Sequence, residues 1–286
     1  MLSDRDLRIA VPSKGRLRDR TLEILEGAGV RVRVEGRRLH AKCPETGLNV
    51  IFSNAGDIPV LVAGGVVDLG ITGSDNIAEK DVDVVTHRDL GFGRCRLSIA
   101  VHQDKPYRCA ADLAGKRVGT KFVRLARAHF ERAGAEVDLF EIQGATEVMV
   151  MLGLVEGIVE LVETGSSLEE NDLREIEKIL DAEAVLIGNR APRDADLQER
   201  LLRRIDGVLH AARYSLLEYN CPVERVEQAK RITPGFSSPT VQELADPRWC
   251  SVKVLVEKVD VHRVMDELEK IGCQAILESE LRHTRL

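Results

Sequence analysis

Aromatic side chains are scarce in this chain, and their scarcity argues against one class of function. Only 3% of the 286 residues are Phe, Trp or Tyr, which does not suit the stacking platforms that bind single-stranded nucleic acid. The net charge of −6 at pH 7 also lacks the positive excess that DNA- and RNA-binding proteins use to neutralise phosphates. We therefore expect no nucleic-acid partner, although local basic clusters leave room for small anionic substrates.

Zinc-ligand spacing, a secretory leader and long hydrophobic runs are also missing. The six cysteines are scattered, with no two separated by only two residues, so we expect reduced thiols buried as small hydrophobes rather than a zinc site. The N-terminal residues contain two aspartates and run into a strand-like segment, unlike a signal peptide. The longest apolar runs, such as residues 58–67, are too short to span a bilayer. We therefore expect a cytoplasmic protein with no membrane contact.

What is present describes a globular protein of more than one domain. With 44% hydrophobic and 31% charged residues, the chain can form two or three compact units with buried cores. Strand-like apolar runs alternate with helical patterns, which favours parallel α/β units. The strands are expected at residues 7–11, 50–53, 66–71, 94–101, 116–120, 137–142, 157–162 and 184–187.

The helical patterns between these strands fall into two series. They begin near residues 17, 58 and 74 and then occupy residues 123–133, 146–152 and 192–212. Asp57 is expected to cap one short helix, with Pro59 in its first turn. The two series join near residue 100, which predicts two lobes with a cleft between them.

The pattern of elements changes from Tyr214 onward. Strand-like segments at residues 216–220, 249–256 and 275–281 are interleaved with helical segments at 222–229 and 261–271. The order strand, helix, strands, helix, strand is typical of a small ferredoxin-like α+β domain.

The segment Glu160–Leu168 has the residue types of a phosphate-binding loop. It follows a predicted strand and leads into a helix whose first N–H groups can point at an anion, while Gly165 lets the backbone approach closely. Its threonine and serines add hydroxyl donors, and its glutamates could accept hydrogen bonds from ribose hydroxyls. Ser167 and Glu170 have the spacing of a capping box. An ordinary Ser/Gly loop with solvated glutamates remains the alternative on these residues alone.

A wider set of stretches, in order along the chain, resembles the ATP phosphoribosyltransferase family, which opens histidine biosynthesis. Glu147, Gly153 and residues 158–168 are similar to the family signature. Earlier matches are residues 9–17 (Ile-Ala-Val-Pro-Ser-Lys-Gly-Arg-Leu), 57–59 and 68–75. Stretches that look like the regulatory domain of the family's long form are residues 219–222, 232–241, 263–268, 271–272 and 275–277. The resemblance covers nearly the whole chain, and the combination is far more specific than any single motif.

The resemblance implies an α/β catalytic core of two lobes, like the periplasmic binding proteins, and a C-terminal ferredoxin-like (ACT-like) α+β domain. Lobe I would comprise residues 1–98 and 186–212, lobe II residues 99–185, and the regulatory histidine-binding domain residues 213–286. The implied reaction transfers the phosphoribosyl group of phosphoribosyl pyrophosphate to N1 of ATP, giving phosphoribosyl-ATP and pyrophosphate. Mg²⁺ would serve the pyrophosphate, histidine would inhibit through the C-terminal domain, and the chain would form homo-oligomers, as dimers and hexamers.

The resemblance also assigns binding residues. Those expected to bind phosphoribosyl pyrophosphate are Glu147, Glu160, Glu163, Thr164, Gly165, Ser166, Ser167 and Leu168. Those expected to bind ATP are Ser13, Lys14, Gly15, Arg16, Gly73, Ser74 and Asp75. Those expected to bind histidine are Asn220, Ser238, Thr240 and Ala275. No catalytic residue is predicted, because attack by a ring nitrogen as pyrophosphate leaves needs positioning and charge neutralisation rather than a strong general base.

The chain departs from the family pattern at positions that bear on binding. Glu160 stands where Asp is usual and Ser167 where Thr is usual, so a carboxylate and a hydroxyl are kept. Asn54 stands where an Arg is common, which removes a cation expected near ATP. Glu79 is expected either on the cleft side of its helix or in solvent, and the basic stretch at residues 116–127 is interpreted as a solvated face.

Three alternative functions remain open from the sequence. A solute-binding protein on the same two-lobed plan would be expected to carry a signal peptide. A catalytically silent regulatory or binding paralogue is favoured only by the departures at Asn54 and Glu160. A phosphoribosyltransferase that acts on another base would share the donor loop.

Overall fold

The computed structural model describes residues 6–32, 39–142, 144 and 146–285. The chain forms two compact units, Met1–Glu23 with Val30–Gln198, and Ile24–Gly29 with Glu199–Leu286. Two sheets belong to the first unit and one to the second, and the lobe boundaries given above stay predictions. Among the described residues, no helix is long and apolar enough to cross a membrane.

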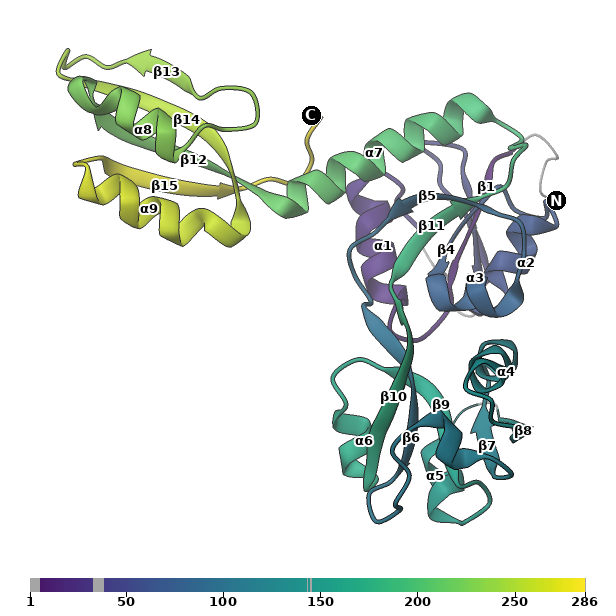
Figure 1. The fold of residues 1–286 in the computed structure, drawn as a ribbon. Coiled ribbons are helices and arrows are strands. Elements are labelled where there is room, and N and C mark those ends of the chain that lie inside the picture. The colour runs from purple at the N-terminus through teal and green to yellow at the C-terminus, as the bar shows by residue number, and fades with distance from the viewer. Residues whose placement is uncertain (1–5, 33–38, 143, 145, 286) are drawn as a thin grey trace. The chain divides into compact units, whose positions relative to one another are not determined.

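Lobe I is built on a six-stranded sheet in the order β2-β3-β1-β4-β11-β5 (Figure 1). Its elements are β1 (Arg8–Pro12), α1 (Arg18–Gly27), β2 (His40–Lys42), β3 (Asn49–Ser53), α2 (Ile58–Ala63), β4 (Leu69–Gly73), α3 (Ser74–Lys80), β5 (Val85–Asp89) and β11 (Ala184–Gly188). Strands β4 and β11 are buried along their whole length, as expected for continuous apolar runs inside an α/β sheet. Strands β3, β1 and β4 run parallel, whereas β11 is antiparallel to both of its neighbours. The predicted parallel arrangement is therefore only partly right.

Lobe II is built on a five-stranded sheet in the order β10-β6-β9-β7-β8. Its elements are β6 (Cys95–His102), β7 (Arg117–Thr120), α4 (Val123–Arg132), β8 (Asp138–Glu141), α5 (Thr146–Met151), β9 (Gly157–Val162), α6 (Ser166–Glu170) and β10 (Leu173–Ala182). Strand β7 is parallel to β8 and β9, and β6 is antiparallel to β9 and β10. Strand β10 was not predicted, because its charged sequence lacks a continuous apolar run and most of its residues are only partly buried.

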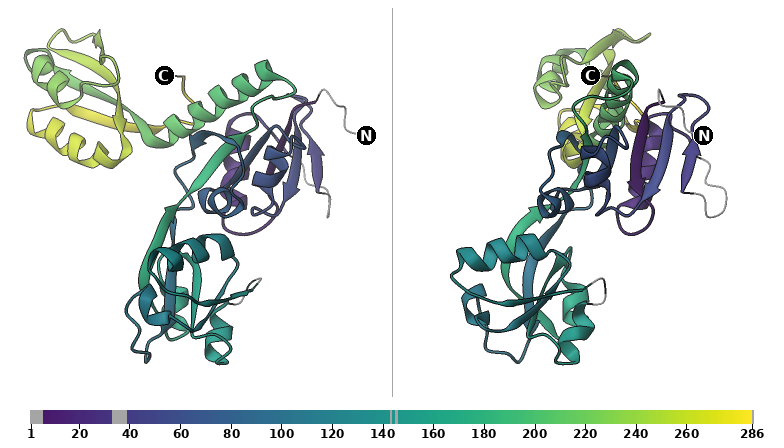
Figure 2. Two further views of the ribbon diagram at one scale, coloured as in Figure 1. Left: turned by 45° about the vertical axis from the view of Figure 1, so that its right-hand side comes forward. Right: turned by 90° about the vertical axis from the view of Figure 1, so that its right-hand side faces the viewer.

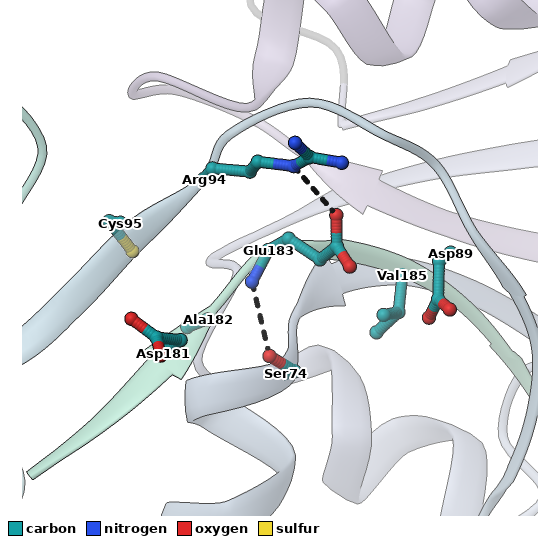
Figure 3. A pocket seen from close by; sticks show the side chains of 8 residues that line it. All are labelled: Ser74, Asp89, Arg94, Cys95, Asp181, Ala182, Glu183 and Val185. Carbon is teal, nitrogen blue, oxygen red and sulfur yellow. Dashed lines mark hydrogen bonds and ion pairs between the residues drawn. The ribbon is translucent and has the colours of Figure 1, made fainter.

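The chain passes between the two lobes twice, from β5 into β6 and from β10 into β11 (Figures 1 and 2). The two crossings are hydrogen bonded to each other, because the Ala184 amide donates to the Phe92 carbonyl at 3.0 Å. Figure 3 shows Glu183 at this hinge between Ser74 and Arg94: its amide donates to Ser74 Oγ at 3.2 Å and its carboxylate lies 3.4 Å from Arg94 Nε. The hinge is therefore cross-linked by polar contacts around a cavity of about 340 Å³.

Asp57 precedes α2 as expected, but its side chain does not cap the helix. The residue has helical backbone angles, φ −93° and ψ −21°, and its carboxylate makes no cap hydrogen bond. Pro59 lies at the start of the helix as predicted, where a missing N–H group costs nothing.

The second unit carries a four-stranded antiparallel sheet in the order β13-β14-β12-β15, which is the strand order of a ferredoxin-like domain. Its elements are α7 (Ala195–Arg213), β12 (Tyr214–Pro222), α8 (Val226–Ile232), β13 (Thr240–Glu243), β14 (Trp249–Glu257), α9 (Val261–Lys270) and β15 (Gln274–Glu280). Burial alternates strictly along β12, so one face of the sheet packs against Ala229 of α8 and Val264 and Leu268 of α9. The predicted α+β domain is confirmed.

Five of the six cysteines are buried free thiols, as predicted, but Cys109 is exposed. Three of them, Cys221, Cys250 and Cys273, belong to the core of the C-terminal domain. Burial raises the pKa of the Cys221 thiol to about 12. A thiol that stays protonated is a poor nucleophile and metal ligand, so this cluster is a packing feature.

Candidate active site

All eight residues predicted to bind the phosphoribosyl donor line one cavity in lobe II. The cavity has a volume of about 280 Å³ and lies where β9 runs into α6. Its lining residues are Arg16, Glu147, Glu160, Leu161, Val162, Glu163, Thr164, Gly165, Ser166, Ser167 and Leu168. We call this space the donor cavity. The structure thus brings Glu147 of α5 beside the loop, whereas the ligand contacts themselves stay predictions.

Gly165 gives the donor loop its shape. Its φ of +96° is in the left-handed region, and a Cβ placed there would have no heavy atom within 4 Å. The first α-helical hydrogen bond of α6 runs from the Glu169 amide to the Gly165 carbonyl at 3.1 Å. The amides before Glu169 therefore lie in the first turn, where N–H groups have no partner within the helix. Thr164 Oγ1 and Ser166 Oγ lie 3.0 Å apart, so hydroxyl groups collect at the same turn.

Two carboxylates of the donor cavity converge on one buried hydroxyl. Thr146 Oγ1 lies 3.1 Å from Glu160 Oε2 and 3.4 Å from Glu147 Oε2. Ser167 Oγ donates to Glu147 Oε1 at 3.2 Å. The predicted capping box at Ser167 is therefore wrong, since Gly165 is the N-cap of α6 and the Ser167 hydroxyl is bonded to α5 instead.

Arg16 connects lobe I to the donor loop. Its Nη1 donates to the Gly93 carbonyl at 2.6 Å and to Glu163 Oε1 at 3.0 Å, and its Nη2 donates to Cys95 Sγ at 3.0 Å. Burial raises the pKa of the Cys95 thiol, and the charge of Arg16 opposes that rise. Arg16 was predicted as an ATP contact. It belongs to the turn between β1 and α1, and its side chain bonds to Gly93 and Cys95 near the hinge and to Glu163 of the donor loop.

A second cavity, of about 380 Å³, opens from lobe I beside the donor cavity, and we call it the ATP cavity. It is lined by Lys14, Gly15, Arg16, Leu17, Asn54, Ala55, Gly56, Asp57, Asp75, Asn76, Glu79, Lys80, Lys121, Phe122 and Leu161. Arg16 and Leu161 line both cavities, so the two spaces are neighbours.

Four of the seven residues predicted to bind ATP line the ATP cavity, namely Lys14, Gly15, Arg16 and Asp75. The other three are placed differently. Ser13 continues the sheet, with its amide donating to the Ser53 carbonyl at 2.8 Å. Gly73 is the buried end of β4, and a Cβ there would collide with the Asp75 carboxylate. Ser74 lines the hinge cavity.

Several lining residues of the ATP cavity were not predicted. They come from the turn after β3, from α3 and from the β7–α4 turn of lobe II. No short motif joins segments so far apart in the sequence. The signals in the sequence were the departure at Asn54, the family-like residues 57–59, the possible cleft position of Glu79 and the basic stretch that contains Lys121.

Asp75 is a buried carboxyl group in the ATP cavity. Its exposed fraction is 1%, and its Oδ1 has no hydrogen-bond partner among the residues that the structure describes. Burial raises the Asp75 pKa above its ordinary value, while the charges of Arg16 and Lys121 act in the opposite direction. A polar atom buried without a partner is costly, and in a cavity of this kind it is a candidate for contact with a ligand.

Glu79 lines the ATP cavity, which confirms the cleft-side prediction, but its carboxylate is already hydrogen bonded. Its carboxylate accepts the backbone N–H groups of Arg124 at 2.9 Å and Leu125 at 3.0 Å, in the first turn of α4. Arg124 in turn donates to the Ala78 carbonyl at 2.8 Å and pairs with Asp81 at 2.6 Å. Helix α3 of lobe I is therefore joined to the N-terminus of α4 of lobe II, and Arg124 takes part in this junction although its side chain is 48% exposed.

The four residues predicted to bind histidine come from different segments of the second unit. Asn220 on β12 pairs with Gln274 on β15, beside an irregularity where Ala275 has φ +49°. Thr240 lies on the edge strand β13, with β14 between it and β12, and Ser238 is exposed. A cavity of about 850 Å³ in this unit is lined by other residues.

The described residues contain no group of three or more His, Cys, Asp or Glu side chains that could hold a metal ion. Mg²⁺ commonly uses only one or two carboxylates and takes its other ligands from water and substrate phosphates. Glu147 and Glu160, brought together at Thr146, fit that smaller requirement.

These features define a class of protein: a two-lobed α/β core in which a loop rich in hydroxyl and turn amide groups opens beside a second cavity lined by several lysines. The fold resembles a substrate-binding protein of an amino acid ABC transporter, with TM-score 0.50, 14% identity and coverage of 72% of this chain and 94% of that chain. It also resembles a structure described as an ATP phosphoribosyl transferase (HisG:HisZ) complex from Thermotoga maritima, with TM-score 0.60, 24% identity and coverage of 70% and 98%. At these identities the likeness shows the fold alone.

Sequence relationships give the family. Residues 54–207 match the family described as ATP phosphoribosyltransferase, and residues 211–283 match the one described as HisG, C-terminal domain. A protein named ATP phosphoribosyltransferase in Rhodopirellula baltica is 42% identical, over 99% of this chain and 95% of the relative. Those of Methanopyrus kandleri and Mycobacterium tuberculosis are 38% and 36% identical, over 94% and 98% of this chain and 96% and 99% of the relatives. The chain belongs to the ATP phosphoribosyltransferase family, in the long form with a C-terminal domain, and is a transferase.

Proposed function

We propose that this chain transfers the phosphoribosyl group of phosphoribosyl pyrophosphate to N1 of ATP, in the first step of histidine biosynthesis. The observation that carries the proposal is the pair of neighbouring cavities that share Arg16 and Leu161. One has the hydroxyls, turn amides and carboxylates that a phosphorylated ribose needs, and the other is lined by cations suited to a triphosphate.

The donor would lie with its 5′-phosphate against the turn at Gly165 and its ribose hydroxyls toward Glu160 and Glu163. The carboxylates accept hydrogen bonds from the diol, and the left-handed Gly165 lets the phosphate approach the backbone. ATP would lie across the turn at Lys14, with its adenine directed at C1′ of the donor. Holding the two substrates in line supplies most of the rate enhancement, because no strong base is required.

Mg²⁺ is proposed to accompany the donor, and when bound it neutralises the charge that develops on pyrophosphate. Glu147 and Glu160 are the residues of this chain that would hold it. Thr146 orients both carboxylates, as hydrogen bonds commonly do around metal ligands.

The chain is proposed to act in the cytoplasm as a homo-oligomer, either a dimer or a hexamer. Histidine is proposed as an inhibitor that binds the C-terminal domain through Asn220, Ser238, Thr240 and Ala275. Asn220 on β12 and Thr240 on β13 are separated by strand β14. Inhibition from there would have to favour one arrangement of the assembly over another.

The test is to incubate the full chain with ATP, phosphoribosyl pyrophosphate and Mg²⁺ and to detect phosphoribosyl-ATP by mass spectrometry. No adduct from well-folded protein would refute the proposal, and an adduct with a free base instead of ATP would show a different acceptor. Addition of histidine to the same assay tests regulation, since undiminished turnover at saturating histidine would remove the inhibitor from the proposal.

A further inference from the structure

Lys121 is the lysine that lobe II contributes to the junction of the two cavities. It lines the ATP cavity, and its Nζ lies 3.5 Å from Oε1 of Glu160, which lines the donor cavity. We propose that Lys121 binds the pyrophosphate group of the donor and neutralises it as it leaves. This inference rests on the proposed function and adds a residue to which no role in binding or catalysis has been assigned above.

The backbone of Lys121 is held in place by the preceding residue. Thr120 is fully buried, its Oγ1 donates to the Val159 carbonyl at 2.7 Å, and the same oxygen accepts the Phe122 amide at 2.9 Å. The ammonium also lies 4.9 Å from the centroid of the buried Phe122 ring, a favourable cation–π position. The turn therefore presents Lys121 at the carboxyl end of β7, next to β9, where ligands of α/β sheets bind.

The positive charge of Lys121 is only partly compensated by its contact with Glu160. Its side chain is 40% exposed and that of Glu160 is 17% exposed. A contact of 3.5 Å is long for a charge-assisted hydrogen bond, which is commonly about 2.8 Å, and an ammonium has three N–H donors. Lys121 can therefore turn to a stronger anion when Glu160 turns to the ribose hydroxyls.

The other cations of the ATP cavity are less suited to this task. Arg16 is already bonded to Gly93, Cys95 and Glu163. Lys14 and Lys80 are exposed like Lys121, but they belong to lobe I, on the side that the acceptor would occupy.

Transfer of the phosphoribosyl group requires that negative charge be neutralised on the departing pyrophosphate. The bond between C1′ and the pyrophosphate oxygen breaks, and the bond between C1′ and N1 of adenine forms. The electron pair of the broken bond goes to pyrophosphate, and the proton that the adenine amino group loses goes to water. Stabilisation of the departing anion lowers the barrier, because the negative charge grows as the bond breaks.

The experiment compares Lys121→Met with Lys116→Met, an exposed lysine just before the opposite end of β7. Binding of inorganic pyrophosphate to the full chain is measured by calorimetry with Mg²⁺ present. Loss of a charged contact predicts a dissociation constant roughly 10- to 100-fold higher for Lys121→Met, and no such change for Lys116→Met. In turnover, kcat should fall in Lys121→Met more than the KM for ATP rises, and Lys121→Arg should restore part of the loss.

Unchanged pyrophosphate affinity in folded Lys121→Met overturns the inference and leaves the proposed function standing. Lys121→Gln is the second variant if the methionine variant does not fold. If the wild type binds pyrophosphate through Lys121 but makes no phosphoribosyl-ATP, the proposed function fails and the anion site remains. Equal weakening by both substitutions would mean that general surface charge, rather than Lys121, attracts the anion, and would also overturn the inference.

Discussion

Arg16 Nη1 lies 3.0 Å from Glu163 Oε1, and this ion pair joins the turn after β1 to the donor loop. The two side chains are 28% and 50% exposed, so the pair contributes little stability, on the order of 0.2–1 kcal/mol. Its importance is positional, since Arg16 lines both cavities and Glu163 lines the donor cavity.

Arg16→Met should lower kcat/KM by about 10- to 100-fold, because the variant loses a charged hydrogen-bond donor that lines both cavities proposed to bind the substrates. The free energy of unfolding, measured with urea, should change by less than about 1 kcal/mol. Arg18→Met is the matched control, since Arg18 pairs with the neighbouring Asp19 on the surface of α1. Wild-type kcat/KM in Arg16→Met would contradict the placement of Arg16 between the substrates.

Glu79→Ala should loosen the junction of α3 and α4. The variant removes the acceptor of two first-turn N–H groups, a loss comparable with a helix N-cap, about 1 kcal/mol. Hydrogen exchange at the amides of Arg124 and Leu125 should accelerate, and urea should unfold the variant at a lower concentration. Glu131→Ala, in the last turn of the same helix, is the control and should be neutral or slightly stabilising, because a carboxylate opposes the helix dipole there. Unaltered exchange at both amides in Glu79→Ala would show that the junction does not depend on this carboxylate.

Local patterns predicted the donor cavity well and the ATP cavity only in part. The donor loop is one continuous segment with a glycine at its turn, and Glu147 was identified from the family signature. The ATP cavity is assembled from separate segments of both lobes, so the contributions of Asn76 and Lys121 depend on tertiary contacts that no local pattern encodes. Ser74 fits a strand-turn-helix pattern, but its hydroxyl is directed to the hinge and accepts the Glu183 amide.

In the fold, too, features encoded by a local sequence pattern were predicted, and features that depend on tertiary contacts were not. Strands with continuous apolar runs, such as β4 and β11, were predicted because burial on both faces requires them. Strand β10 lies at the edge of its sheet and carries charges on residues that are partly solvated, so its sequence does not differ from that of a surface segment. The antiparallel direction of β11 results from the return of the chain through the hinge, which alternation of strands and helices does not reveal.

Gly165→Leu should abolish donor binding while the fold persists. The position has φ +96°, and a Cβ added there would meet no heavy atom within 4 Å, so a larger side chain would project into the space meant for phosphate. Gly134→Leu is the matched control, because Gly134 has φ +67° and equally open surroundings outside the cavity. Both variants carry a similar backbone strain, about 1–2 kcal/mol. Calorimetry should show loss of phosphoribosyl pyrophosphate binding only in Gly165→Leu, and retained affinity there would count against the donor loop.

Asp75→Asn should make the protein more stable near neutral pH and less active. Burial raises the Asp75 pKa above its ordinary value of 3.8, so the folded state favours the protonated carboxyl group. The protonated carboxyl group therefore contributes stability below about pH 4, and this contribution is lost as the pH rises through the pKa of the folded state. Asparagine cannot ionise, so the gain in melting temperature over the wild type should be largest near pH 7 and shrink toward about pH 4. Asp57→Asn, at an exposed carboxylate of the same cavity, should give no comparable gain. The KM for ATP should rise in Asp75→Asn, because a costly buried carboxylate is retained where it serves binding; a stabilised variant with unchanged KM would separate Asp75 from the ATP site.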